Sequence, residues 1–245
     1  MTVVLKLGGS VITDKDRPET LDGDALERAA AAVASVDSDT DLVVVHGGGS
    51  FGHHNASEHG VSTTEGTHDA SAALAIHGAM TTLNGFVLQR LLERDVNAVP
   101  VHPFSVAHRD RDGRLSLPTG QIRTLLAEGF VPVLHGDLVA HEGAGATVVS
   151  GDELVADLAT DLEADRVGLC STVPGVLDDA ERVIDRIATY EDVASVLGES
   201  ESTDVTGGMA AKVRALLALE ASASIFGLAD LDAFLAGGEP GTTVE

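Results

Sequence analysis

The sequence is short of cysteine, tryptophan and lysine: one cysteine, no tryptophan and three lysines occur in 245 residues. The single Cys170 excludes an internal disulfide and any metal site built on cysteine ligands. No uninterrupted apolar run approaches the length of a membrane-spanning helix, about 20 residues. The chain enters a strand-like segment, TVVLKL, directly, without the pattern of a signal peptide. We therefore expect a cytoplasmic protein with no membrane partner.

Positive charge is also scarce, because 39 acidic residues face 15 basic ones and the net charge is -24. Such a surface repels nucleic acid and anionic membranes. It also opposes folding by self-repulsion unless salt screens it, and at about 1 M salt the screening length is only ~3 Å. Together with 3% aromatic residues, this composition predicts a protein adapted to a halophilic cytosol, with no nucleic-acid partner.

The three lysines, Lys6, Lys15 and Lys212, all lie close to glycine-rich segments. Lysine is usually a common surface residue, so a chain that has lost nearly all of it retains the remaining copies for a reason. An ammonium group beside a glycine turn is a favourable partner for phosphate. The lysines are therefore the first candidates for chemistry.

Alternation of apolar strands and helical segments predicts an α/β protein with a mainly parallel sheet covered on both faces. DG and EGAG turn signals predict β-hairpins at 105–118 and 136–150. We expect one domain, 1–245, with an N-terminal substrate lobe (1–150) and a C-terminal nucleotide lobe (151–245). The predicted strands are 2–7, 41–46, 97–101, 130–135, 165–170 and 222–227, and the predicted helices are 22–36, 70–94, 119–128, 152–163 and 208–221.

Two glycine loops follow the first two predicted strands: KLGGS at 6–10 and HGGGSFGH at 46–53. The second fits a dinucleotide fingerprint through Gly47, Gly49 and Gly52, and a hydrolase nucleophile elbow around Ser50. The dinucleotide fingerprint lacks the acidic residue that should follow at the end of a strand about 20 residues on. The hydrolase pattern also fails, because its oxyanion-hole motif, HGGG, overlaps the nucleophile elbow here instead of preceding it. The interpretation that remains is a strand-end turn whose amides face an anion.

Two further segments carry charge at predicted helix starts. Residues 203–212, TDVTGGMAAK, place Lys212 in the first turns of a helix, where its charge adds to the helix dipole. Residues 150–157, SGDELVAD, offer Ser150 or Asp152 as a helix cap. Asp152 is alternatively a residue that orients a catalytic lysine.

Five segments in this order resemble the amino-acid-kinase family: KLGGSVITDK, HGGGSFGH, VPVLHGD, SGDELVADLA and DVTGGMAAK. The resemblance implies a three-layer αβα sandwich with hairpin insertions, and transfer of the γ-phosphoryl group of ATP, with Mg²⁺ bound through ATP. The combination of ITDK with a histidine ending HGGGSFGH is similar to members that act on isopentenyl phosphate in archaeal isoprenoid synthesis. Relatives are commonly homodimers, and the helix at 70–94 is a candidate dimer face.

The resemblance also implies roles for individual residues. Lys6, Lys15 and His53 are expected to be catalytic, with Lys15 acting on the transferring group and His53 on the acceptor phosphate. ATP is expected to contact Lys6, Gly8, Gly9, Ser10, Gly49, Ser171, Thr172, Gly208 and Lys212. The acceptor is expected to contact Gly48, His53, Gly151, Ala73 and Ile76.

Departures from the family pattern leave alternatives open. The family usually has a T-D-V-D-G-like segment near the adenine, and this chain has Ser171-Thr172-Val173-Pro174-Gly175 in its place. A nucleotide with a base other than adenine is therefore an alternative substrate. The residues around the expected position of the acceptor tail are small. Prenyl phosphates longer than isopentenyl phosphate are therefore alternative acceptors. The competing activities are phosphonate, UMP and amino-acid kinases of the same fold, a non-catalytic nucleotide-binding protein, and a hydrolase using Ser50.

Overall fold

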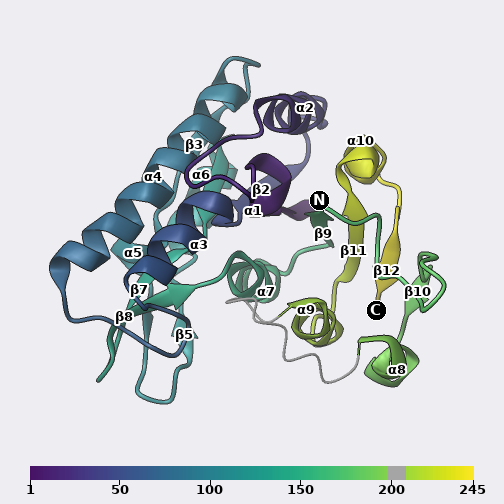
Figure 1. Ribbon diagram of the computed structural model, residues 1–245. Coiled ribbons are helices and arrows are strands. Elements are labelled where there is room, and N and C mark those ends of the chain that lie inside the picture. The colour runs from purple at the N-terminus through teal and green to yellow at the C-terminus, as the bar shows by residue number, and fades with distance from the viewer. Residues whose placement is uncertain (198–207) are drawn as a thin grey trace.

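The computed structural model describes residues 1–197 and 208–245. Its centre is an eight-stranded sheet in the order β10-β12-β11-β9-β1-β2-β6-β3 (Figure 1). Every neighbouring pair is parallel except β11 with β12. The strands are β1 (Thr2–Leu7), β2 (Asp41–His46), β3 (Ala98–Pro100), β6 (Val131–His135), β9 (Arg166–Ser171), β10 (Arg186–Ile187), β11 (Ser222–Gly227) and β12 (Thr242–Val244).

Helices cover both faces of this sheet, which confirms the predicted three-layer sandwich (Figure 1). Side chains alternate along β1, so that Val3 and Leu5 pack on one helical layer and Val4 on the other. The first layer contains α2 (Gly23–Ala34), α4 (Ala70–Leu92) and α10 (Leu231–Leu235). The second contains α6 (Gly120–Ala127), α7 (Gly151–Asp161) and α9 (Gly208–Leu217).

The shorter elements connect these layers. They are α1 (Gly9–Ile12), α5 (Pro103–Val106), α8 (Ala194–Leu197) and the 3₁₀ turns η1 (Tyr190–Asp192) and η2 (Leu228–Asp230). The start of the predicted segment 203–212 lies outside the described residues, and its description begins at Gly208.

Both predicted hairpins form, and together they make a second, four-stranded sheet in the order β5-β4-β7-β8. Its strands are β4 (His108–Arg109), β5 (Leu115–Ser116), β7 (Asp137–His141) and β8 (Gly145–Val149). Gly113 and Gly143 have φ of 83° and 86°, values that suit glycine in tight turns. The hairpin insertions thus become one small sheet beside the end of the central one.

The segment after β2 differs from the expected strand-end turn, because residues Gly49–Glu58 form the helix α3. Its apolar and amide side chains explain this: Phe51 and Ala56 are buried, and the Asn55 amide donates to Glu19 at 2.8 Å. Tertiary packing therefore gives helical structure to a glycine- and histidine-rich stretch of low intrinsic helix propensity.

Helix α4 is long and apolar enough to cross a membrane by length and composition, in contrast to the expectation from uninterrupted runs. Core helices meet the same criterion, and α4 packs against α2, α3 and the strands β3, β6 and β7. Most of its buried apolar side chains, among them Leu83 and Val87, belong to the core between this helical layer and the sheet.

Candidate active site

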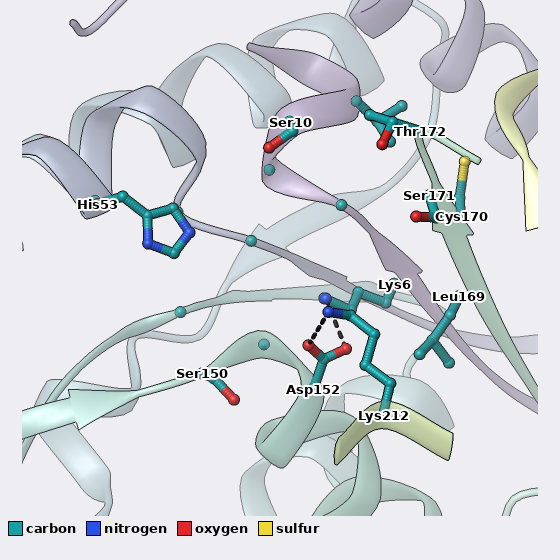
Figure 2. Close-up of a pocket in the computed structure, with 18 of the residues that line it drawn as sticks. Lys6, Ser10, His53, Ser150, Asp152, Leu169, Cys170, Ser171, Thr172 and Lys212 are labelled. Carbon is teal, nitrogen blue, oxygen red and sulfur yellow. Dashed lines mark hydrogen bonds and ion pairs between the residues drawn. The ribbon is translucent and has the colours of Figure 1, made fainter. Parts of the chain in front are cut away.

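A cavity of about 300 Å³ opens where β1, β2 and β9 end and α7 begins (Figure 2). Ligand sites of open α/β sheets form at the carboxyl ends of the strands. The cavity brings together residues from segments far apart in the sequence. Of the predicted site residues it is lined by Lys6, Gly8, Gly9, Ser10, Gly48, His53, Ile76, Gly151, Ser171, Thr172, Gly208 and Lys212.

Asp152 gathers two of the three lysines at this cavity. Its carboxylate accepts from Lys6 Nζ at 2.7 Å and lies 3.5 Å from Lys212 Nζ (Figure 2). Burial by itself raises the pKa of Asp152, but the two ammonium groups outweigh burial and hold the pKa below its ordinary value. The carboxylate is therefore ionised and fixes two cations at the cavity wall.

The first turn of α7 has separate residues for capping and for orientation. Ser150 caps the helix, since its hydroxyl accepts from the Glu153 amide at 3.1 Å. Asp152 is thereby left to orient the lysines, which settles the two interpretations of this segment. The N-terminus of α7 adds a positive dipole end to the two ammonium groups, so this side of the cavity suits a polyphosphate.

The two glycine loops pack backbone against backbone at Gly9 and Gly49. A Cβ placed on Gly9 would lie 2.1 Å from the Gly49 amide nitrogen, and one on Gly49 would lie 2.2 Å from Thr13 Oγ1. Gly49 also has φ of 49°, a conformation that favours glycine. No side chain fits at either position. Gly49 therefore contacts the first loop and does not itself line the cavity.

His53 projects toward the cavity from α3, across from the lysines (Figure 2). The wall on this side is apolar and includes Ala56, Ile76 and Met80 from the helices and Val148 and Val149 from β8. The predicted contact residue Ala73 is packed beside Ile76 but lies outside the lining. His54 and His59 are exposed, as expected of surface residues.

Lys15 is exposed and lines a second hollow, which shares Ser10 and Thr172 with the cavity. The loop that carries it is held by Ser50, whose hydroxyl accepts from the Thr20 amide and donates to the Thr20 carbonyl, both at 3.2 Å. Ser50 is 7% exposed, and its hydroxyl is bonded to both backbone groups of Thr20. The hydroxyl is therefore not presented as a nucleophile.

Sequence reasoning missed Asp137, which lines the cavity from the start of β7. Its fully buried carboxylate pairs with His77 Nδ1 of α4 at 2.9 Å. Burial raises the pKa of Asp137, and the bond to Asp137 raises the pKa of His77. The signal available in the sequence was the HGD triplet of VPVLHGD, but its partner lies sixty residues earlier.

A model of the amino acid kinase family matches residues 1–225. This chain belongs to the amino acid kinase family. Solved structures of the family share its architecture at lower similarity too: UMP kinase from Ureaplasma parvum superposes with a TM-score of 0.68 at 14% identity, over 100% of this chain and 99% of that one. That likeness concerns the fold alone.

Among amino acid kinases, the chain is similar to isopentenyl phosphate kinases. It is 62% identical to that of Haloferax volcanii, over 99% of this chain and 98% of the relative. It is 38% identical to that of Methanothermobacter thermautotrophicus, over 89% and 86%. A solved isopentenyl phosphate kinase structure superposes with a TM-score of 0.85 at 31% identity, covering 100% of both chains. The acidic composition expected of a halophilic protein agrees with the Haloferax relative.

Proposed function

We propose that this protein is an ATP-dependent isopentenyl phosphate kinase, which transfers the γ-phosphoryl group to isopentenyl phosphate and releases isopentenyl diphosphate and ADP. One observation carries the proposal: two ammonium groups bound to Asp152 face His53 across a cavity. The isopentenyl phosphate kinases at 62% and 38% identity support it.

The geometry suits transfer between two phosphates. Phosphoryl transfer requires positioning and positive charge more than covalent catalysis. A phosphate acceptor is already ionised at neutral pH, so it needs no strong base. In this proposal Lys6 and Lys212 hold the phosphates of ATP, Lys15 stabilises the transferring group, and His53 binds the acceptor phosphate.

The apolar wall beside His53 suits a short hydrocarbon tail. The uncharged side chains that would contact this tail are the branched Ile76 and Val148 and the thioether of Met80. UMP and amino-acid acceptors carry polar groups that this wall would leave unpaired, which costs binding energy. The wall therefore favours a prenyl monophosphate over these alternatives.

We assign Mg²⁺ to the phosphates of ATP. No group of three His, Cys, Asp or Glu side chains in residues 1–197 and 208–245 could hold a metal ion. Asp152, the carboxylate beside the two lysines, already has both oxygens occupied. Mg²⁺ bound through ATP would neutralise the charge that develops during transfer, and Lys6 and Lys212 would hold the phosphates that carry it.

A coupled ADP-release assay in molar KCl tests the proposed activity. Isopentenyl phosphate should be turned over at a kcat/KM at least about 100-fold above that of fosfomycin, UMP or N-acetylglutamate, a discrimination that buried unpaired polar groups can supply. Faster turnover of any of these three acceptors would replace the proposed substrate. Absence of turnover with all four would favour a non-catalytic nucleotide-binding protein.

The outer face of α4 supports a homodimer. Residues 70–89 of this helix contain no acidic residue, lysine or arginine, although the chain has a net charge of -24. Leu74 and Leu92 are 67% and 56% exposed there, and both lie on one side of the helix. We assign this face to a second copy, because such an uncharged surface is unusual on so acidic a protein.

Light scattering in molar KCl checks the dimer. The wild-type protein should have twice the mass of the 25.1 kDa chain, and Leu74→Glu should return it to the monomer mass. A monomeric wild type would refute the assignment.

We further assign the protein to the cytoplasm as a single domain, with the substrate in the lobe 1–150 and the nucleotide in the lobe 151–245.

A further inference from the structure

Two buried histidines occupy equivalent places at the ends of neighbouring strands. His46 ends β2 and His135 ends β6, and the two are partners in the register of the sheet. Their rings stack with centroids 5.5 Å apart. Each is followed by a glycine, and each Nδ1 lies beside the carbonyl oxygen of that glycine, at 3.1 Å for Gly47 and 2.9 Å for Gly136. The same local arrangement therefore occurs twice.

The carbonyl partners decide which ring nitrogen carries the proton. A carbonyl oxygen only accepts, so Nδ1 must be protonated in both rings. Burial lowers the pKa of His46 to about 4 and the pKa of His135 well below its ordinary value, so both rings are neutral at pH 7. A neutral imidazole with hydrogen on Nδ1 has an acceptor at Nε2. Each Nε2 therefore needs a donor.

Both donors are present. His102 Nδ1 lies 2.8 Å from His135 Nε2 and donates to it. His46 Nε2 lies 3.2 Å from Asn84 Oδ1, whereas the buried Asn84 Nδ2 has no partner among the described residues. Two acceptors do not bond, and a half-turn of the amide directs its N–H at His46 and satisfies both groups. Asn84 and His102 thus select the same tautomer in the two rings.

The held carbonyls belong to the glycine turns at the cavity. A trans peptide directs its C=O and its N–H to opposite sides. Holding the Gly47 carbonyl against the ring therefore turns the Gly48 N–H away from the ring, and Gly48 lines the cavity. The Gly136 amide donates to the His46 carbonyl at 2.9 Å, which links the second turn to the first.

We propose that His46, kept in the Nδ1–H form by Asn84, is a positioning residue that aims the Gly48 amide at the acceptor phosphate, and that His135, kept in the same form by His102, holds the adjoining Gly136 turn against it. The rings do not touch the reacting atoms; they fix the peptide planes that do. This inference rests on the proposed kinase function for the identity of the acceptor, but the tautomer can be tested without it.

Nitrogen-15 spectroscopy of the histidine-labelled wild-type protein tests the tautomer. Among the ten histidines, His46 and His135 should show a protonated Nδ1 and an unprotonated Nε2 from pH 8 down to pH 5.5, and neutral His102, which donates through Nδ1, should share this pattern at pH 8. His46→Asn and His135→Asn should each remove one of these signal pairs and so assign them. An Nε2–H tautomer, or protonation of either ring within this pH range, would overturn the proposal.

A matched pair of substitutions tests the positioning role. An Asn amide nitrogen replaces Nδ1 and keeps the bond to Gly47, whereas a Gln amide reaches the Nε2 position and loses that bond. His46→Gln should raise KM for isopentenyl phosphate about tenfold, as expected for one lost hydrogen bond, with KM for ATP within about twofold. His46→Asn should keep acceptor KM within about threefold of wild type, and the exposed His59→Gln serves as control.

The outcomes separate the inference from the proposed function. Equal effects of Gln and Asn at position 46, or a parallel rise in both KM values, would show a merely structural role and overturn the positioning proposal. If the wild-type protein does not phosphorylate isopentenyl phosphate, the proposed function fails, and the spectra still decide the hydrogen-bond assignment.

Discussion

Asp152 is the residue on which the charge arrangement of the cavity depends. Lys6 and Lys212 come from β1 and α9, more than two hundred positions apart, and both bond to this carboxylate. In other parts of an acidic surface a carboxylate would repel a phosphate. Here it holds two cations in place, so the local balance is positive although the chain as a whole is strongly negative.

Replacing Asp152 by Asn should lower kcat/KM about 100-fold, because a displacement of about 1 Å in catalytic groups can cost that factor. The measurement is steady-state kinetics with both substrates varied in turn. Asp161→Asn, an exposed change on the last turn of the same helix, should leave the parameters near wild type. An equal loss of kcat/KM in both variants would mean that activity depends on the total charge of α7 and not on the orientation of the lysines by Asp152.

His53 and Lys15 should fail in different ways when truncated. If His53 binds the acceptor phosphate as proposed, His53→Ala should raise KM for isopentenyl phosphate far more than KM for ATP. Lys15→Ala should lower kcat about 100-fold with small changes in either KM, since a group that acts on the transition state contributes chiefly to kcat. Similar losses of ATP affinity in the two variants would contradict these assignments.

Helix α7 joins the small sheet to the cavity. Arg109 of β4 is 5% exposed and donates through both terminal nitrogens to Glu153, the residue after Asp152. Its second nitrogen also donates to the Val148 carbonyl of β8 at 3.2 Å. The apolar wall of the cavity and the turn that binds the lysines are therefore connected through one guanidinium group. A bidentate arginine pair fixes geometry better than a lysine would.

One turn further along α7, burial and the charges of Asp161 and Glu153 raise the pKa of Asp157 to about 6. The folded state then binds more protons than the unfolded chain between about pH 4 and 6, so stability falls as pH rises through this window. Asp157→Asn should thus stabilise the protein by about 1 kcal/mol at pH 7.5, a value reduced for solvent screening, and by almost nothing at pH 4.

Urea unfolding of wild type and variant at the two pH values measures this difference. The salt concentration must be the same throughout, because screening weakens the repulsion from Asp161 and Glu153. A variant that is destabilised at pH 7.5 would show that Asp157 is favourably ionised in the fold.

The elements differed in how far the sequence predicted them. Runs such as TVVLKL and DLVVVH became β1 and β2 with the expected bounds, because buried parallel strands have continuous apolar sequences. Helix α3 was missed because its glycines and histidines have low helix propensity, and its stability comes from packing. The bond of Asp137 to His77 and the contacts of His46 were out of reach, since strand ends and α4 meet only in the folded chain.

At the scale of the whole molecule, salt should control both stability and activity. With a net charge of -24, self-repulsion opposes the compact state and repels anionic substrates in dilute buffer. At about 1 M salt the screening length is ~3 Å, so these long-range effects vanish while the buried lysine pairs persist. Raising KCl from 0.1 M to 2 M should increase both Tm and kcat/KM.

Thermal unfolding and initial rates across a KCl series measure the two quantities. Sorbitol at matched water activity is the control, because it changes hydration without screening charge. Full stability and activity in 0.1 M KCl would show that the acidic surface is not an adaptation to salt.

The carboxylate shared by two lysines also bears on the turnover cycle. A cation that binds only nucleotide must become fully hydrated each time ADP departs. Lys6 and Lys212 instead share an internal counter-ion, the Asp152 carboxylate, at 2.7 and 3.5 Å. If both lysines bind ATP as proposed, the departure of ADP would leave each ammonium group with this partner, so neither would need full hydration before the next nucleotide binds.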